Sequence, residues 1–351
     1  MENEKEEKST NDTSKNSEDV KNYSDSPSFK ICKNVIVFPA NCLEINEVIG
    51  EGGCGLVKAA RYKTINFALK TSFNCLNKRS EEDLRSTIKE VNVLKHLRHQ
   101  NIPIFYGLYN TENENVTNQK FNSILIERIM GDNMQEMFNK NSSMNTLMKI
   151  KFCIDIGKVL CFIHNNHIIH RDFKPNNIMI DNKLNVKILD FGISKMAKST
   201  MPTENPRCGT VLYFSPEHAE FIQEDNGENI DIHIEISKKI DIWALGLIIN
   251  QLFSGDLPWK EKGIRHDNAF KVLIILMQKT PFMVSQKITN KDIIECVKNC
   301  TLNEKQERYS AEKLFLHFMF SLYNLLRNKE NRRKEIEEFF SFKEYSAISS
   351  K

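Results

Sequence analysis

The sequence predicts an α+β fold in two lobes, a β-rich first lobe with one major helix and a mainly helical second lobe. Three observations lead to this prediction. The first third of the chain carries short runs of β-branched and aromatic residues separated by turn residues. From Met144 onward, apolar residues recur at helical spacing. The length of 351 residues is also sufficient for about two units of 100–200 residues each.

The β-rich part has an alternation of strand-like runs and turns. We expect short strands at residues 43–50, 56–62, 66–71, 104–109 and 123–127. One helix is expected over residues 80–97, because apolar residues recur on one of its sides, at Ile88, Val91, Leu94 and Leu97. The polar, Asn-rich residues 110–120 are interpreted as a surface loop of a hairpin.

The second part of the chain is mostly helical. We expect helices at residues 150–165, 240–253, 292–298 and 311–327. The second of these is nearly all apolar, which is typical of a buried helix. Residues 223–237 are polar and are interpreted as an exposed insertion.

Both ends of the chain are polar. Residues 1–34 consist largely of Glu, Lys, Asn, Ser, Asp and Thr, so they cannot bury enough apolar surface to offset their ordering entropy, and we expect a disordered tail. A plain solvated tail and a regulatory, phosphorylated tail are both open. Residues 326–351 form a basic C-terminal extension, for which a solvated helix end is the simplest interpretation.

The composition limits the classes of partner and compartment. The 49 basic and 46 acidic residues give a formal net charge of +3, which does not favour nucleic acid as a partner. No apolar run approaches the ~18 residues of a membrane span, and the polar start does not fit a secretory signal. Nine cysteines without a CxxC pair predict reduced thiols in the cytoplasm, with the nucleus as an alternative.

The most informative stretch is HRDFKPNN, at residues 170–177. It places a carboxylate (Asp172), a cation (Lys174) and an amide (Asn177) at short spacings in one loop. Asp172 can accept a proton from a hydroxyl, Lys174 can neutralise a phosphate oxygen, and Asn177 can offer an oxygen ligand to a divalent metal. These are the groups needed to move a phosphoryl group from a nucleotide to an alcohol.

A glycine-rich segment precedes this loop in the chain. Residues 50–57 read GEGGCGLV, which matches the pattern GxGxxGxV. Glycine lets backbone amides approach phosphates without a Cβ in the way. An ordinary hairpin turn or a dinucleotide fold could carry the same pattern, but in dinucleotide folds it joins a strand to a helix. Here it is expected to join two strands.

These motifs, with others in a fixed order, resemble those of eukaryotic serine/threonine protein kinases. The further motifs are Phe67-Ala68-Leu69-Lys70, Asp190-Phe191-Gly192, Cys208-Gly209-Thr210, Ser215-Pro216-Glu217 and the segment from Asp241 to Gly246. The resemblance covers about residues 43–325, with a first lobe at about 43–128 and a second at about 129–325. Phe67 replaces the family's Val and Ser215 replaces its Ala.

The resemblance implies an ATP site. Its residues would be Ile49, Gly50, Glu51, Gly52, Gly53, Cys54, Gly55, Val57, Ala68, Lys70, Glu90, Ile126, Glu127, Ile129 and Met179. Lys70 would hold the α- and β-phosphates with Glu90 as its counter-charge. Glu90 is chosen over the other acids of its helix because it precedes the apolar stripe by the family's spacing. Ile126 would lie beside adenine, and the Glu127 carbonyl and Ile129 amide would pair with the adenine edge.

The resemblance also assigns metal-binding and structural residues. Asp190 and Asn177 would bind Mg²⁺, with Mn²⁺ as an alternative. Asp241 would cap the backbone of the catalytic loop. Glu217 should pair with Arg308, because a buried unpaired charge would be costly.

The same resemblance indicates which hydroxyl groups receive the phosphoryl group and how the activity of the enzyme is regulated. Lys174 is typical of kinases that act on Ser and Thr of protein substrates, and Thr210 would tie the substrate loop to the catalytic residues. Arg171 can help to receive a phosphate on the activation loop, placed there by an upstream kinase or by autophosphorylation. The acceptor candidates are Ser199, Thr200 and Thr203, of which Thr203 is favoured.

Two other functions compete with an active protein kinase. A pseudokinase scaffold usually lacks residues of the type of Lys70, Asp172 or Asp190, and all three are present. A small-molecule kinase is disfavoured by the intact segment that runs from Gly209 to Glu217. Cys54 and Cys208 are interpreted as small side chains, with electrophile-sensitive thiols as the alternative.

Overall fold

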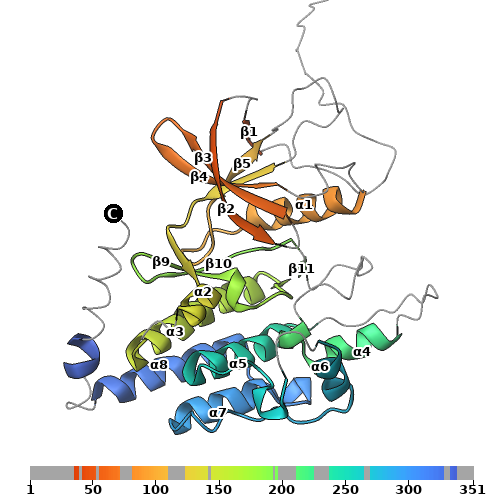
Figure 1. Ribbon diagram of the computed structural model, residues 1–351, viewed down its shortest axis with the longest axis vertical. Coiled ribbons are helices and arrows are strands. Elements are labelled where there is room, and N and C mark those ends of the chain that lie inside the picture. The colour runs from red at the N-terminus through yellow and green to blue at the C-terminus, as the bar shows by residue number, and fades with distance from the viewer. Residues whose placement is uncertain are drawn as a thin grey trace, which may run out of the picture.

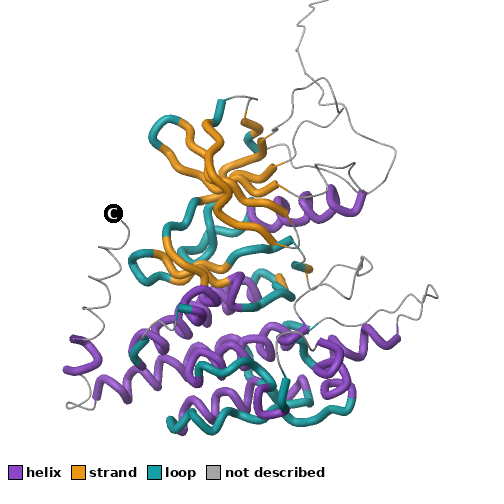
Figure 2. The backbone as a smooth tube through the Cα atoms, in the orientation of Figure 1, coloured by secondary structure: helices purple, strands orange, loops and turns teal. Residues whose placement is uncertain are grey.

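A computed structural model describes residues 35–38, 42–52, 55–71, 81–109, 123–140, 144–192, 194–196, 211–224, 237–264, 269–327 and 333–337. These residues form a β-rich lobe and a helical lobe, and the β-rich lobe lies above the helical lobe in Figure 1. Strands gather in the upper lobe and helices in the lower lobe when the backbone is coloured by secondary structure (Figure 2). The prediction of a two-lobed α+β fold is therefore confirmed.

The upper lobe is built on a six-stranded sheet. Its strands are β1 (Val37–Phe38), β2 (Glu44–Gly52), β3 (Gly55–Tyr62), β4 (Ile65–Thr71), β5 (Phe105–Tyr109) and β6 (Ser123–Glu127). Their order is β1-β5-β6-β4-β3-β2, and every pair is antiparallel except β1 with β5. The expected strands are all present. β1 was not expected, because two residues are too few to show a periodic pattern.

One helix, α1 (Glu81–Leu94), packs on this lobe. Its expected apolar stripe is buried in the core, from Ile88 to Leu97. The expected end at residue 97 is wrong, because the chain leaves the helix after Leu94. The amides of His96 and Leu97 then reach carbonyls only three residues back, at 3.2 and 3.3 Å. This tightening is common in the last turn of a helix.

The lower lobe contains the remaining helices. They include α2 (Met134–Asn139), α3 (Thr146–Asn165), α4 (Pro216–Glu224), α5 (Lys239–Ser254), α6 (Ala269–Met277), α7 (Lys291–Cys300) and α8 (Ala311–Arg327), and residues 333–337 are also helical. The four expected helices correspond to α3, α5, α7 and α8, and α8 has the expected bounds. α3 begins four residues earlier than expected because Asn145 accepts a hydrogen bond from the Met148 amide and so caps it. The helices α2, α4 and α6 were missed.

Two small antiparallel sheets lie where the lobes meet. One contains β7 (Gly131–Asn133), β9 (Ile178–Asp181) and β10 (Val186–Ile188), and the other contains β8 (Ile168–Ile169) and β11 (Lys195–Met196). A short 3-10 helix, Pro175–Asn177, precedes β9. These short elements hold the segments in which the candidate catalytic residues lie.

The core of the lower lobe surrounds α5 and α3. α5 is buried on all its sides, as its apolar sequence predicts. α3 packs against α8, and a Cβ on Gly157 would lie only 3.2 Å from the Phe315 Cα, so a larger residue would force the two helices apart. Within the described part of the chain, no helix combines the length and apolar composition that a bilayer crossing requires.

The remaining expectations for surface segments fall mostly outside the described residues. These are the N-terminal tail at 1–34, the loop at 110–120 and most of the basic extension at 326–351. The expected insertion at 223–237 begins too early, because residues 223 and 224 complete α4, and residues 225–236 lie outside the described part.

Candidate active site

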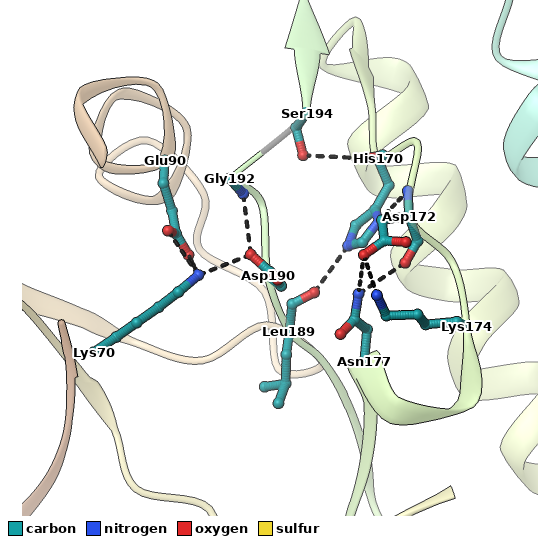
Figure 3. A network of polar contacts seen from close by, with 10 residues as sticks. All are labelled: Lys70, Glu90, His170, Asp172, Lys174, Asn177, Leu189, Asp190, Gly192 and Ser194. Carbon is teal, nitrogen blue, oxygen red and sulfur yellow. Dashed lines mark hydrogen bonds and ion pairs between the residues drawn. The ribbon is translucent and has the colours of Figure 1, made fainter. Parts of the chain in front are cut away.

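The loop between β8 and β9 carries Asp172, Lys174 and Asn177 (Figure 3). Pro175 starts the 3-10 helix that turns Asn177 back toward Asp172. The Asn177 Nδ2 donates to the backbone oxygen of Asp172 and to its Oδ2, each at 2.9 Å. Lys174 Nζ lies 2.7 Å from the same Oδ2. The Asp172 side chain, in a residue only 8% exposed, is therefore held in one orientation.

A buried carboxylate on α5 holds the backbone of this loop from below. Asp241 accepts hydrogen bonds from the amides of His170 and Arg171, each at 2.9 Å, and contacts His164 Nε2 at 2.9 Å. Burial alone would raise the pKa of Asp241, but the hydrogen bonds and nearby histidines lower it below its ordinary value. Arg171 adopts a positive φ of 72°, which is uncommon for a non-glycine residue and is fixed here by its bond to Asp241.

Asp190 lies across the site from Asp172, directly after the strand β10 and Leu189 (Figure 3). Its Oδ1 is 2.8 Å from Lys70 Nζ and accepts from the Gly192 amide at 3.3 Å. The charge of Lys70 lowers the pKa of Asp190 to about 2, although burial opposes this change. Asp190 is thus an anion at neutral pH, as a metal ligand must be. Its φ of 63° is a second left-handed position in the site.

The His170 ring connects the loop that carries Asp172 to the segment that carries Asp190. It packs 4.6 Å from the Phe173 ring and 5.0 Å from the Phe191 ring, between centroids. Its Nε2 contacts the Leu189 oxygen at 2.9 Å. The spacing between the catalytic loop and the segment that holds Asp190 is therefore set by a packed aromatic group.

Lys70 joins the upper lobe to this site. It lies on β4, and its Nζ is 2.8 Å from both carboxylate oxygens of Glu90, on α1. Burial alone would lower the pKa of Lys70, but the charges of Asp190 and Glu90 and its hydrogen bonds raise it. The ammonium therefore stays charged and is fixed between the two lobes. The expected ion pair of Lys70 with Glu90 is present. The contact of Lys70 with Asp190 was not predicted.

The strand register of the upper sheet places the other ATP-site candidates. Val57 is opposite Lys70, and Ala68 is opposite Ile126. Since cross-strand partners share a face and residues two apart on a strand do too, these four side chains lie on one face. Ala68 is buried, whereas Val57 and Ile126 are half-buried.

The glycine-rich segment closes the hairpin of β2 and β3. Gly50 is opposite Val57 and Gly52 is opposite Gly55, so the segment joins two strands as expected. Ile49 is exposed on the same strand as Glu51. Gly53 and Cys54 lie outside the described residues. From the lower lobe, Met179 on β9 is half-buried and pairs with Lys187 of β10 and Asn133 of β7.

The connection between the lobes contains ion pairs that the sequence did not reveal. The Glu127 carboxylate lies 2.9 and 2.7 Å from Lys187 Nζ and accepts from the Ile104 amide at 3.1 Å. Arg128 contacts Glu47 at 2.9 Å. These partners are 60 and 81 positions away in the chain, so no local pattern could indicate them. The backbone contacts expected from Glu127 and Ile129 to adenine stay predictions.

The end of the activation segment is anchored to the lower lobe. Glu217, in the first turn of α4, forms two bonds to Arg308, at 2.6 and 2.8 Å. The expected pair is present. The other candidates of this segment, Ser199, Thr200, Thr203, Cys208 and Thr210, lie outside the described residues, while Arg171 is half-buried beside Asp172.

The donor set suits a divalent metal that prefers oxygen ligands. Asp190 offers a carboxylate, and Asn177, whose amide nitrogen is engaged by Asp172, can present only its Oδ1 oxygen. Among the described residues there is no cluster of three or more His, Cys, Asp or Glu side chains that could hold a metal by itself. A metal here would therefore take further oxygens from the nucleotide phosphates or water.

Comparison with known proteins decides the family. The family model described as "Protein kinase domain" matches residues 43–320. The chain belongs to the protein kinase family. This kinase is 27% identical to mitogen-activated protein kinase kinase 1 of Arabidopsis thaliana over 289 residues, which are 80% of this chain and 75% of that protein. It is 27% identical to the serine/threonine-protein kinase Aurora-2 of Arabidopsis thaliana over 278 residues, 78% of this chain and 88% of that protein.

A third relative comes from yeast. The kinase is 28% identical to the Aurora kinase of Saccharomyces cerevisiae over 253 residues, 69% of this chain and 60% of that protein. The prediction of an ATP-dependent serine/threonine protein kinase is confirmed by these relatives and by the family match. Use of ATP with a divalent metal ion follows from the family.

Proposed function

We propose that this kinase transfers the γ-phosphoryl group of ATP to Ser or Thr hydroxyls of protein substrates, with Asp172 as the base. The observation that carries the proposal is the fixed Asp172 carboxylate, held by Asn177 at 2.9 Å and by Lys174 at 2.7 Å. A base contributes to catalysis only when it is positioned to meet the proton it accepts. The relatives named as protein kinases support protein substrates for this chain.

Each residue has a distinct part in this proposal. Asp172 orients the acceptor hydroxyl and takes its proton as the oxygen attacks the γ-phosphorus. The bond from the γ-phosphorus to the β–γ bridging oxygen breaks, and ADP leaves. Lys174, beside Asp172, neutralises charge that develops on the transferred group. Lys70, fixed by Glu90, positions the α- and β-phosphates of the nucleotide. Positioning and electrostatic stabilisation supply most of the catalysis in phosphoryl transfer.

We propose Mg²⁺ as the metal, with Asp190 and Asn177 as its protein ligands. A metal ion held by these two residues would neutralise negative charge on the nucleotide phosphates. Mg²⁺ usually takes only one or two protein ligands and completes its shell with phosphate and water, which suits a site with two oxygen donors. Activity lost in EDTA should return with Mg²⁺. A preference for Mn²⁺ at matched free concentration would contradict this assignment.

One assay tests the proposed reaction. The purified chain is incubated with Mg-ATP and a mixture of protein substrates, beside the variants Asp172→Asn and Glu304→Gln. Loss of a positioned base typically costs about 10²–10⁴ in rate, so Asp172→Asn should be slower by that factor. Glu304→Gln removes an exposed carboxylate of the lower lobe and should match the wild type. Thermal unfolding of each variant checks that it is folded.

The other outcomes of the assay identify the alternatives. No transfer by the wild type, even after phosphorylation of its activation loop, would favour a pseudokinase scaffold. Transfer to small alcohols but not to proteins would favour a small-molecule kinase. Equal rates for the wild type and Asp172→Asn would remove Asp172 from the reaction.

We also propose phosphorylation of the activation loop, by an upstream kinase or by the chain itself. The candidates are Ser199, Thr200 and Thr203. The half-buried Arg171 beside Asp172 supports the proposal, because an activation-loop phosphate can pair with a cation next to the catalytic carboxylate. Full activity of a variant with alanine at all three positions would contradict it.

We propose a cytoplasmic location, which rests on the sequence alone. Imaging of the tagged chain tests this location. A signal confined to the nucleus would contradict it.

A further inference from the structure

The helix α8 has two apolar faces on opposite sides. One face is buried against the lower lobe, with Leu314, Phe318 and Ser321 among its residues. The other face carries Leu316, Met319, Phe320 and Tyr323 at the spacing i, i+3, i+4 and i+7, which forms a continuous stripe. We call these four residues the α8 stripe. At about 100° per residue, the stripe lies opposite the buried face.

The α8 stripe is unusually exposed for its composition. Its residues Leu316, Met319, Phe320 and Tyr323 are 63%, 41%, 62% and 58% exposed. The rings of Phe320 and Tyr323 stack with centroids 6.4 Å apart, so they form one aromatic surface. The outer face of a surface helix is normally polar, whereas exposed apolar clusters of aromatic residues and Met mark protein–protein interfaces.

The spacing of the residues in the α8 stripe is symmetric about its middle, between Met319 and Phe320. If a second copy of the helix packs antiparallel about a two-fold axis at this point, Met319 of one copy lies opposite Phe320 of the other. Leu316 then lies opposite Tyr323. Both contacts occur twice, as a two-fold interface between identical chains requires. The stripe is therefore compatible with self-association about a two-fold axis.

The charges at the two ends of the stripe fit the same arrangement. Glu312 and Arg327 are exposed on the side of the helix that carries the stripe, one at each end. The same two-fold axis brings Glu312 of one copy opposite Arg327 of the other. Among the described residues, neither side chain forms an ion pair within its own chain. A parallel arrangement would instead place like charges together at each end.

We propose that the α8 stripe binds a second copy of this chain, through antiparallel packing of the two α8 helices with Glu312 and Arg327 paired at both ends. The contact extends over the rise between these two residues, about 22 Å at 1.5 Å per residue. A single helix pair covers less area than the standard protein–protein interface. We therefore expect a reversible dimer with a micromolar dissociation constant.

Sedimentation velocity of the full chain over a range of concentrations tests the proposal. The wild type should shift from monomer to dimer as its concentration rises. Phe320→Glu, which places a charge at the centre of the contact, should raise the dissociation constant at least tenfold. Phe270→Glu is the matched control, because Phe270 is 74% exposed on a different helix, α6, and its loss should change nothing. The readout is mass, so it is independent of kinase activity.

A charge exchange tests the arrangement itself. Glu312→Arg alone and Arg327→Glu alone each place like charges at both ends of the dimer, so each variant should dimerise at least tenfold more weakly than the wild type. An equimolar mixture of the two variants restores both ion pairs and should form heterodimers. The double variant carrying both changes should dimerise like the wild type.

Three results would overturn the proposal. The first is a wild type that stays monomeric at about 100 μM, which is 100-fold above a dissociation constant of about 1 μM. The second is a dimer that Phe320→Glu leaves intact. The third comes from a photo-crosslinking residue in place of Phe320. A crosslink to residues 338–351 of the same chain, which contain Phe339, Phe340, Phe342 and Tyr345, would identify that segment as the occupant instead.

Discussion

Glu217 and Arg308 form a bidentate ion pair, at 2.6 and 2.8 Å, between residues 91 positions apart in the chain. The Arg308 guanidinium also donates to the backbone oxygens of Leu302 and Asn303 and lies 4.8 Å from the Trp243 ring centroid. The burial of Glu217 alone would raise its pKa, but Arg308 lowers it overall. The pair therefore connects the end of the activation segment to the centre of the lower lobe.

Removing Arg308 should destabilise the kinase strongly. Arg308→Leu leaves the Glu217 charge without its partner in a mostly buried site, and breaking a buried pair in this way costs about 3–5 kcal/mol. Arg308→Lys keeps the charge but cannot form two parallel bonds, so its loss should be intermediate. Urea unfolding measures the free energy. Arg333→Leu, at a side chain that is 87% exposed, is the control and should change little. Equal stabilities for Arg308→Leu and the wild type would contradict the structural role.

Asp241→Asn should slow catalysis although Asp241 acts only by supporting the catalytic loop. The amide that replaces one carboxylate oxygen cannot accept from both His170 and Arg171, so the catalytic loop loses a support. A displacement of about 1 Å at reacting groups can cost about 10² in rate. Steady-state kinetics should show that kcat falls by about this factor at unchanged ATP KM.

A second buried acid gives the control for Asp241. Asp155, on α3, pairs with Lys151 at 2.6 Å and does not touch the catalytic loop among its described contacts. Asp155→Asn should lose stability while the folded protein keeps its kcat. If Asp155→Asn lowered kcat as much as Asp241→Asn, general destabilisation rather than support of the loop would explain both.

His218 should make the kinase less stable as pH falls from 7 toward 4. Burial first, and then the charge of Arg171, lowers the pKa of His218 from 6.5 to about 4. In the unfolded chain, His218 therefore becomes protonated near pH 6.5. In the folded chain, it becomes protonated only near pH 4. Stability from this group is present above pH 6.5 and is lost as pH falls through this window, by about 2 kcal/mol between pH 7 and 5.

The variant His218→Phe tests this pH dependence. It should flatten the decrease in unfolding free energy between pH 7 and 5, measured in urea at several pH values. His96→Gln, at an exposed histidine, should retain the wild-type slope. A His218→Phe variant with the wild-type slope would show that another group causes the loss of stability between pH 7 and 5.

Gly107→Ala should release β1 from the edge of the upper sheet. A Cβ at position 107 would lie 2.4 Å from the Ile36 oxygen, which accepts from the Leu108 amide at 2.8 Å. Overpacking of this kind typically costs about 1–3 kcal/mol, so the short strand should leave. Hydrogen exchange at the Leu108 amide should become faster. Gly50→Ala, whose Cβ would meet nothing closer than 3.7 Å, is the control and should leave this amide protected.

Elements formed by local interactions could be predicted from the sequence, whereas those that depend on distant partners could not. The long helices α3, α5 and α8 could be predicted because each buries a face or its whole surface, which leaves a periodic or continuous apolar pattern. The strand β1 and the short helix α2 left no such pattern. α2 depends instead on the capping box formed by Asn133 and Glu136.

The candidate site shows the same division. The pairs of Lys70 with Glu90 and of Glu217 with Arg308 were expected from motifs whose spacing is set by the fold. The contact of Lys70 with Asp190 and the ion pair of Glu127 with Lys187 were not expected. Each joins segments at least 60 positions apart whose residue types alone do not require a partner.

The sequence by itself determined the family and predicted which residues carry the chemistry, because phosphoryl transfer requires a base, a cation and oxygen ligands at short spacings that a linear chain can display. Only the tertiary structure decided how these groups face one another. The position of Lys70 between Glu90 and Asp190 and the support of the catalytic loop by Asp241 depend on the packing of the lobes. The exposure of the α8 stripe was decided in the same way, because a helix with two apolar faces does not reveal in its sequence which face the core will bury.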